Sequence, residues 1–270
     1  MVRLFQENQM EDGRHSSKGN QLKWRNGEFW YKADYTGYEG LTEYVVSHLL
    51  QYTNLHPDEY VIYDTEQIQY GEQKYRGCVS RNFLPDGWQL ITLERLFQLS
   101  YGESLNRSIY HITGTEERIR FLTEQTERLT GLSGFGIYIS KMLAIDAFFL
   151  NEDRHTHNMA VLMDEKNGYH LCPFFDHGAA LLSDTTMDYP LESELYGLID
   201  KVQSKTFCPD FVSQTDQADQ MYGMQIRFHF GEEQVREIMA EEKYYPEEIK
   251  ERVINVLLEQ KRKYRYLFCE

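Results

Sequence analysis

One segment near the middle of the chain, residues 135–150, is almost entirely apolar, and it constrains the fold more than any other feature. Its clearly polar positions are Ser140, Lys141 and Asp146. An apolar run of this length without an amphipathic period is typical of a helix that is buried on all sides. Such a helix would fix the position of the polar loop that follows it, residues 151–158.

A β-hairpin is expected after this loop. Apolar runs at 159–163 and 169–175 flank a turn-forming segment, residues 164–168. The returning strand leads to Asp176, and Gly178 would let the backbone turn sharply after it. The hairpin is therefore expected to return Asp176 to the polar loop.

Three oxygen-bearing side chains in this region, Asp153, Asn158 and Asp176, have a spacing that suits phosphoryl transfer. This chemistry requires an aspartate that orients the attacking hydroxyl and further oxygen ligands for the Mg²⁺ that bridges the phosphates. Protein kinases place a metal-binding asparagine five residues after the catalytic aspartate, which is also the offset between Asp153 and Asn158. The sequence Asp176-His177-Gly178 supplies the Asp-x-Gly turn that follows in kinases.

Two motifs, Asn-Glu-Asp-Arg-His-x-x-Asn from residue 151 and Pro-Phe-Phe-Asp-His-Gly from residue 173, resemble the atypical kinases of the HipA-like and CtkA-like group. These kinases are relatives of the phosphatidylinositol 3/4-kinase fold. The resemblance implies an α+β, bilobed protein-kinase-like fold, with a small β-rich N-lobe, 1–83, and a larger helical C-lobe, 84–270. The remaining chain matches in general layout only. Classical HipA toxins also carry an N-terminal subdomain for which this chain has no room.

The resemblance also implies ATP and Mg²⁺ as cofactors and a serine or threonine hydroxyl of a protein as the acceptor. Asp153 would orient that hydroxyl, while Asn158 and Asp176 would hold the metal. His155 stands where ordinary kinases often have a lysine near the transferred phosphate. It would hydrogen-bond the phosphate or brace the loop, and as a switchable cation it could make the rate pH-dependent.

The N-terminal part of the chain predicts a tight hairpin, with strands at 21–24 and 28–33 around an Asn-Gly turn. The preceding loop could wrap nucleotide phosphates with backbone N–H groups, hydroxyls and a lysine, through Ser16, Ser17, Lys18 and Gly19. An ordinary polar loop is an equally good interpretation of this pattern. By position, Ser16 or Ser17 is a candidate for autophosphorylation.

Lys32 lies in an aromatic and apolar strand, where its side chain would face solvent or a buried anion. In a kinase-like lobe, a strand lysine contacts the α- and β-phosphates and pairs with a glutamate on the next helix. An apolar stripe predicts that helix at 38–52. Glu43 lies off the stripe and is the candidate partner of Lys32, and Glu39 is the alternative.

Two short strands, 60–63 and 76–80, are predicted next. By resemblance, the second leads into the hinge that holds adenine, around 78–83, and Ser80 is therefore a nucleotide-binding candidate. Pro85-Asp86-Gly87 marks a turn and a natural lobe boundary.

Beyond this turn the pattern becomes helical. Helices are predicted at 92–99, 115–129, 191–202, 214–227, 232–239 and 246–268. Residues 179–190 would occupy the position of a kinase activation segment, with Ser183, Thr185 and Thr186 as candidate phosphosites.

The net charge, 28 basic against 43 acidic residues or −15, disfavours nucleic acid and anionic membranes as partners. The cysteines at 78, 172, 208 and 269 have no metal or redox spacing and are expected to be reduced thiols of a cytoplasmic protein. The N-terminus lacks the apolar core of a signal peptide, and no apolar run is long enough to cross a bilayer.

Several alternatives stay open on the same residues. A small-molecule or lipid kinase would share the catalytic motif. A nucleotide-binding scaffold in a toxin–antitoxin-like pair, with a regulatory or antitoxin protein as partner, is a second alternative. Asp153 and Asn158 could simply brace a polar loop, and His155 with His157 could bind zinc, although no nearby Cys or His pair completes a four-ligand set.

Overall fold

The computed structural model describes residues 1–10 and 21–268 of the chain. Its segments form two compact units, and each is described here by itself. Unit 1 consists of residues 1–83, 175–202 and 227–270, and unit 2 consists of 84–174 and 203–226. The lobes expected from the sequence, 1–83 and 84–270, stay a prediction, because compact packing alone does not define catalytic lobes.

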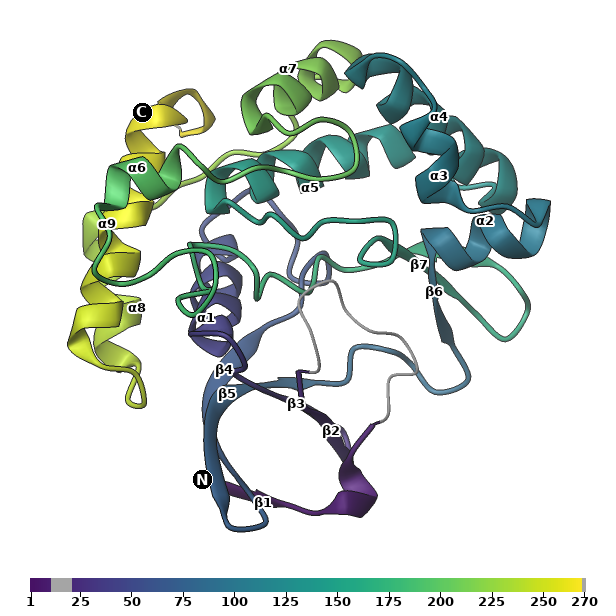
Figure 1. Ribbon diagram of the computed structural model, residues 1–270. Coiled ribbons are helices and arrows are strands. Elements are labelled where there is room, and N and C mark those ends of the chain that lie inside the picture. Colours follow the sequence, from purple (N-terminus) through teal and green to yellow (C-terminus); the bar gives the residue numbers. More distant parts are fainter. Residues whose placement is uncertain (11–20, 269–270) are drawn as a thin grey trace. The chain divides into compact units, whose positions relative to one another are not determined.

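Unit 1 is built on a five-stranded sheet with the strand order β1-β4-β5-β3-β2 (Figure 1). The strands are β1 (Val2–Leu4), β2 (Lys23–Asn26), β3 (Phe29–Ala33), β4 (Tyr63–Tyr70) and β5 (Gln73–Arg81). All neighbouring strands are antiparallel except β1 and β4, which are parallel. The predicted Asn-Gly hairpin joins β2 to β3, and Gly27 in its turn has a φ of +60°.

The strand predicted at 60–63 was placed incorrectly, whereas the strand predicted at 76–80 lies within β5. Strand β4 begins only at Tyr63, and β5 starts earlier than expected, so that the two form a long hairpin through Gly71. Along β4 only Tyr63 and Ile68 are buried. The mostly polar sequence of this strand therefore carries little of the apolar alternation from which strands are predicted.

Helix α1 (Glu39–Leu50) packs against β3, β4 and β5, in agreement with the helix predicted at 38–52. Its apolar stripe, with Leu41, Val45 and Leu49, is fully buried. A glycine on each side permits a close approach: a Cβ atom on Gly40 would lie 2.4 Å from the carbonyl carbon of Gly77 on β5. Helix α1 therefore lies close to β5 at Gly40.

The remaining elements of unit 1 are short or C-terminal. They are α6 (Leu195–Ile199), α8 (Glu232–Glu241), α9 (Glu247–Lys263) and the 3₁₀ turns η1 (Gln6–Asn8) and η2 (Arg265–Leu267). Helix α8 packs against both α1 and α9. The helix predicted at 191–202 is much shorter. It begins only after Glu194, whose carboxylate caps its N-terminus by accepting the N–H groups of Tyr196 and Gly197.

Unit 2 combines a three-stranded antiparallel sheet, in the order β6-β7-β8, with helices. Its elements are β6 (Gln89–Thr92), α2 (Leu93–Tyr101), α3 (Leu105–Tyr110), α4 (Thr115–Thr130), α5 (Phe135–Phe149), β7 (Ala160–Met163), β8 (Tyr169–Leu171) and α7 (Phe211–Tyr222). The predicted hairpin corresponds to β7 and β8. Strand β8 ends before Pro173, which cannot donate to a sheet ladder.

Helix α5 is the buried helix that the sequence predicts, with 13 of its residues buried. Helices α4 and α7 pack against it. Its last residue is followed by Leu150, whose φ of 56° ends the helix in the left-handed region. None of the helices within residues 1–10 and 21–268 is long and apolar enough to span a membrane.

Candidate active site

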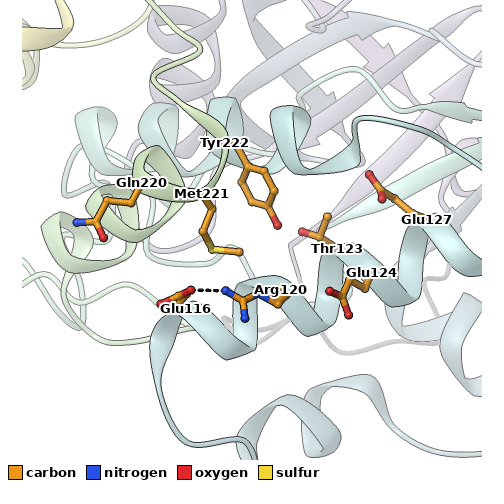
Figure 2. Close-up of a pocket in the computed structure, with 8 residues that line it drawn as sticks. All are labelled: Glu116, Arg120, Thr123, Glu124, Glu127, Gln220, Met221 and Tyr222. Carbon is orange, nitrogen blue, oxygen red and sulfur yellow. Dashed lines mark hydrogen bonds and ion pairs between the residues drawn. The ribbon is translucent and has the colours of Figure 1, made fainter.

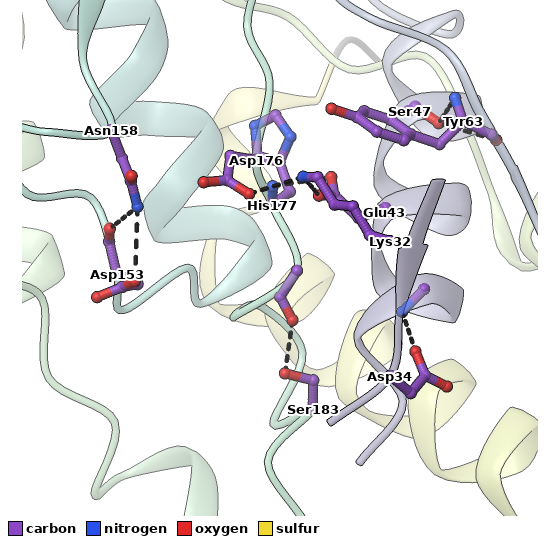
Figure 3. A network of polar contacts seen from close by, with 12 residues as sticks. Lys32, Asp34, Glu43, Ser47, Tyr63, Asp153, Asn158, Asp176, His177 and Ser183 are labelled. Atoms are coloured by element: carbon purple, nitrogen blue, oxygen red, sulfur yellow. Dashed lines mark hydrogen bonds and ion pairs between the residues drawn. The ribbon is translucent and has the colours of Figure 1, made fainter. Parts of the chain in front are cut away.

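In unit 1, Lys32 on β3 lies between two carboxylates (Figure 3). Its Nζ donates to Glu43 Oε1 at 2.6 Å and to Asp176 Oδ1 at 2.8 Å. The expected ion pair between Lys32 and Glu43 is therefore present. The alternative, Glu39, instead accepts the backbone N–H of Thr36 at 2.7 Å and does not pair with the lysine.

The charges of this cluster depend on one another. Burial by itself lowers the pKa of Lys32, but the carboxylates of Asp176 and Glu43 outweigh it and hold that pKa well above its ordinary value. Burial raises the pKa of Glu43, and the ammonium group of Lys32 opposes this rise. Two carboxylates around one ammonium leave an excess of negative charge, which a bound cation would offset.

Asp176 is held in place through its backbone. Its φ of 62° lies in the left-handed region, which aspartate tolerates better than most residues. The N–H of the next residue, His177, donates to Glu43 Oε2 at 2.9 Å. The left-handed residue is Asp176 itself. Gly178, to which the sequence assigned the sharp turn, is not in the left-handed region, and a Cβ there would lie at an ordinary van der Waals distance of 3.4 Å from Glu39 Cβ.

In unit 2, the loop after α5 is anchored to that helix by Arg154. The guanidinium donates from Nε to Asp146 Oδ2 at 2.8 Å and from Nη2 to Asp146 Oδ1 at 3.0 Å. Its Nη1 donates to the carbonyl oxygen of Asn158 at 3.0 Å. Asp146 is fully buried and Arg154 is 5% exposed. This pair was not predicted from the sequence, although an acidic residue within an apolar helix indicates that a partner is needed.

The loop brings Asp153 and Asn158 together (Figure 3). Asn158 Nδ2 donates to the carbonyl oxygen of Asp153 at 2.9 Å and lies 3.5 Å from Asp153 Oδ2. Because the amide nitrogen is directed to Asp153, Oδ1 is the atom of Asn158 that suits a metal. Amide and carboxylate oxygens are hard ligands, so the donors of Asn158 and Asp176 both fit Mg²⁺.

His155 adjoins the aspartate in the same loop. Its Nε2 lies 3.8 Å from Asp153 Oδ2, and its side chain is 21% exposed. Burial lowers the pKa of His155, and the Asp153 carboxylate opposes this only in part. No group of three or more His, Cys, Asp or Glu side chains that could hold a metal ion occurs in the part of the chain that the structure describes. The zinc alternative for His155 and His157 therefore has no third such ligand there.

A pH titration would test the state of His155. Because its pKa in the fold lies below the ordinary value of about 6.5, its contribution to stability is present above about pH 6.5 and is lost as the pH falls through the folded pKa. We expect the His155 Cε1–H signal in NMR spectra, assigned with His155→Gln, to titrate below pH 6.5. A midpoint at or above this value would contradict the lowering of the His155 pKa by burial.

The remaining candidates are those predicted to bind the nucleotide. Ser16, Ser17, Lys18 and Gly19 lie outside the described residues. Ser80 is 8% exposed on β5 and stands opposite Trp30 and Tyr63 in the sheet. Its nucleotide-binding role stays a prediction.

The candidate phosphosites after Asp176 are held by hydrogen bonds. Ser183 is 2% exposed, and its Oγ donates to the carbonyl oxygen of Gly178 at 2.7 Å. Thr186 Oγ1 donates to the carbonyl oxygen of Thr36 at 2.7 Å. Modification of Ser183 would first require this segment to open.

A pocket in unit 2 contains none of the predicted site residues (Figure 2). It has a volume of about 610 Å³ and lies between α4 and α7. Three glutamates, Arg120, Thr123, Gln220, Met221 and Tyr222 line it. Arg120 is paired with Glu116 at its edge. The residues that are expected to carry the chemistry therefore lie outside this pocket.

No protein-family model matches the chain, and no curated protein sequence matches it. Among solved structures, the proinflammatory kinase CtkA of Helicobacter pylori is similar over 90% of each chain, with 16% identity and a TM-score of 0.59. This likeness shows the fold. The α+β, protein-kinase-like fold that the sequence motifs predict is thus confirmed.

A second similar structure is the toxin–antitoxin system HipA, HipB of Shewanella oneidensis MR-1 with its operator DNA. The match covers 94% of this chain and 62% of that one, with 11% identity. Its TM-score of 0.45 is too low to support an argument. The roles of the individual site residues stay predictions.

Proposed function

We propose that this chain is a kinase that transfers phosphate from ATP, with Mg²⁺, to a serine or threonine hydroxyl of a protein. The observation that carries the proposal is Lys32, held within 2.8 Å of both Glu43 and Asp176. Kinases use a strand lysine, paired with a helix glutamate, to position the α- and β-phosphates. The kinase-like fold provides the matching context, since β3 carries the lysine and α1 carries the glutamate.

Each residue of the proposed site would have one task. Lys32 would bind the phosphates, and Asp176 and Asn158 would hold Mg²⁺. Once bound, Mg²⁺ would neutralise charge that develops on the phosphates during transfer. Asp153 would orient the acceptor hydroxyl and accept its proton. The hydroxyl oxygen would then form a bond to the γ-phosphorus while the bond to the β,γ-bridging oxygen breaks, so that ADP leaves.

The choice of a protein acceptor rests on charge and on the resemblance. A chain with a net charge of −15 is repelled by anionic lipid surfaces, which weighs against phosphoinositide substrates. A reduced, cytoplasmic environment fits the three described cysteines, which are all free thiols. A regulatory or antitoxin-like partner belongs to the proposal only through the resemblance.

The proposal is tested by incubating the purified protein with γ-labelled ATP, with and without Mg²⁺, in the presence of cell-lysate proteins or of a panel of lipids and metabolites. We expect Mg²⁺-dependent label on serine or threonine of protein, and none after chelation of the metal. Label confined to lipids or metabolites would identify a small-molecule kinase. Binding of ATP without any transfer would support a scaffold, and no binding of ATP would refute the proposal. Phosphopeptide mapping of Ser16 and Ser17 would test autophosphorylation.

A further inference from the structure

A lysine far along the chain contacts the proposed catalytic aspartate. Lys205 Nζ donates to Asp153 Oδ1 at 2.8 Å, and both residues belong to unit 2. The Asp153 side chain is 12% exposed, and that of Lys205 is 41% exposed. Lys205 is separated from Asp153 by 52 positions, and no sequence motif includes it.

The backbone around Lys205 is held in an unusual conformation. Thr206 has a φ of 75°, in the left-handed region that a β-branched residue rarely adopts. Its Oγ1 donates to the carbonyl oxygen of Arg154 at 2.9 Å, so this strained residue is tied to the loop that carries Asp153. Strain of this kind persists only where the surrounding structure imposes it, and it gathers at functional sites.

Further contacts fix the segment on both sides of the lysine. Phe207 is 1% exposed, and its N–H donates to the carbonyl oxygen of Lys205 at 2.9 Å. Its own carbonyl oxygen accepts from Arg118 Nη1 at 2.7 Å. The N–H of Ser204 donates to the carbonyl oxygen of Pro209 at 2.9 Å. The ammonium group is therefore presented by an ordered loop, which distinguishes this pair from an ordinary ion pair between two surface side chains.

The contact with Lys205 restrains the Asp153 carboxylate. The approach of Asn158 Nδ2 to Asp153 Oδ2, at 3.5 Å, is too long to hold the side chain by itself. His155 also faces Asp153, but burial lowers its pKa and favours the neutral imidazole. Arg154 is directed to Asp146. Lys205 is thus the cation that meets Asp153 at hydrogen-bond distance among these neighbours.

We propose that Lys205 is a positioning residue for phosphoryl transfer, which holds the Asp153 carboxylate oriented for the acceptor hydroxyl. This inference rests on the proposed kinase function. A general base must be unprotonated and in hydrogen-bond reach of the hydroxyl. A fixed ammonium group on one carboxylate oxygen favours the second condition, because it restricts the rotation of the carboxylate.

The test compares Lys205→Met, which removes the charge, with Lys205→Arg, which keeps it. Lys166→Met serves as the matched control, since Lys166 is an exposed lysine of the same unit, in the turn between β7 and β8. In the Mg²⁺-dependent transfer assay, we expect Lys205→Met to lower kcat by about 10- to 100-fold, with the KM for ATP changed by less than about 2-fold. Lys205→Arg should regain most of the rate.

The effect on kcat relative to KM and the recovery in Lys205→Arg separate positioning from a merely structural role. A general loss of structure would also raise the KM for ATP, and the conservative substitution would not restore the rate. Lys166→Met should keep the wild-type kcat and KM. Thermal melting of all four proteins shows whether a lower rate reflects unfolding.

The outcomes are distinguishable. An active wild type with an unchanged rate in Lys205→Met would overturn the inference and leave the kinase proposal intact. A faster Lys205→Met protein would show that the pair is inhibitory, which also overturns it. A slower Lys205→Met protein with a raised KM for ATP and no recovery in Lys205→Arg would reduce Lys205 to a structural brace, which also overturns the inference. A wild type that transfers no phosphate would overturn both proposals.

Discussion

Asp153→Ala and Asp176→Ala proteins are each expected to lose about 100-fold or more of the rate of phosphate transfer from ATP, because positioning and metal charge supply most of the catalysis of this reaction. Asp153 would act on the acceptor hydroxyl, so its loss should lower kcat and leave ATP binding nearly unchanged. Asp176 would hold the metal, so its loss should also abolish the Mg²⁺-dependent part of ATP binding. Transfer of label and calorimetric titration with ATP, with and without Mg²⁺, measure the two effects separately.

A suitable control for both variants is Asp86→Ala, because Asp86 is exposed in the turn before β6. It should retain the wild-type rate. In Asp176→Ala, Lys32 keeps its ion pair with Glu43, so unit 1 should stay folded. Folding is checked by circular dichroism. If either variant keeps more than about a tenth of the wild-type rate, the role given to that aspartate is wrong.

Replacing Asp146 by alanine is expected to lower the free energy of unfolding by about 3–5 kcal/mol, because the guanidinium of Arg154 would remain buried without its partner carboxylate. Asp146 also accepts from Asn151 Nδ2 at 2.7 Å, so the variant removes several hydrogen bonds at once. For a chain of this size, the loss corresponds to a decrease in melting temperature on the order of 10 °C. The measurement is thermal and urea-induced unfolding followed by circular dichroism.

A double variant separates the stabilisation that the ion pair provides from the cost of burying its two charges. Asp146→Leu with Arg154→Met removes both charges, so it should cost less than either single change, since no unpaired charge remains in the interior. The anchor of the loop would still be lost, and we therefore expect a lower transfer rate even where the double variant is stable. An effect of Asp146→Ala below about 1 kcal/mol would show that the pair contributes nothing beyond an exposed one.

Local patterns in the sequence predict the elements that carry the site. The uniform apolar character of residues 135–149 identifies α5 as a buried helix, since a helix without a polar face has no side to present to water. The stripe through Leu41, Val45 and Leu49 identifies α1, and the position of Glu43 beside that stripe identifies the partner of Lys32. In each case the residues that form the pattern are close in the sequence. They lie within one helix, or on a strand and the helix that follows it.

The tertiary structure alone decides which distant residues complete these clusters. Lys205 reaches Asp153, Arg154 turns back to Asp146, and β1 joins the sheet beside β4. The close approach of Gly40 to Gly77 likewise depends on how α1 packs on β5. Contacts between remote segments leave no periodic signal, because they depend on the path of the whole chain and on the need to pair each buried charge. The sequence by itself therefore determined the candidate motif and its supporting elements, while packing decided which cations contact its aspartates.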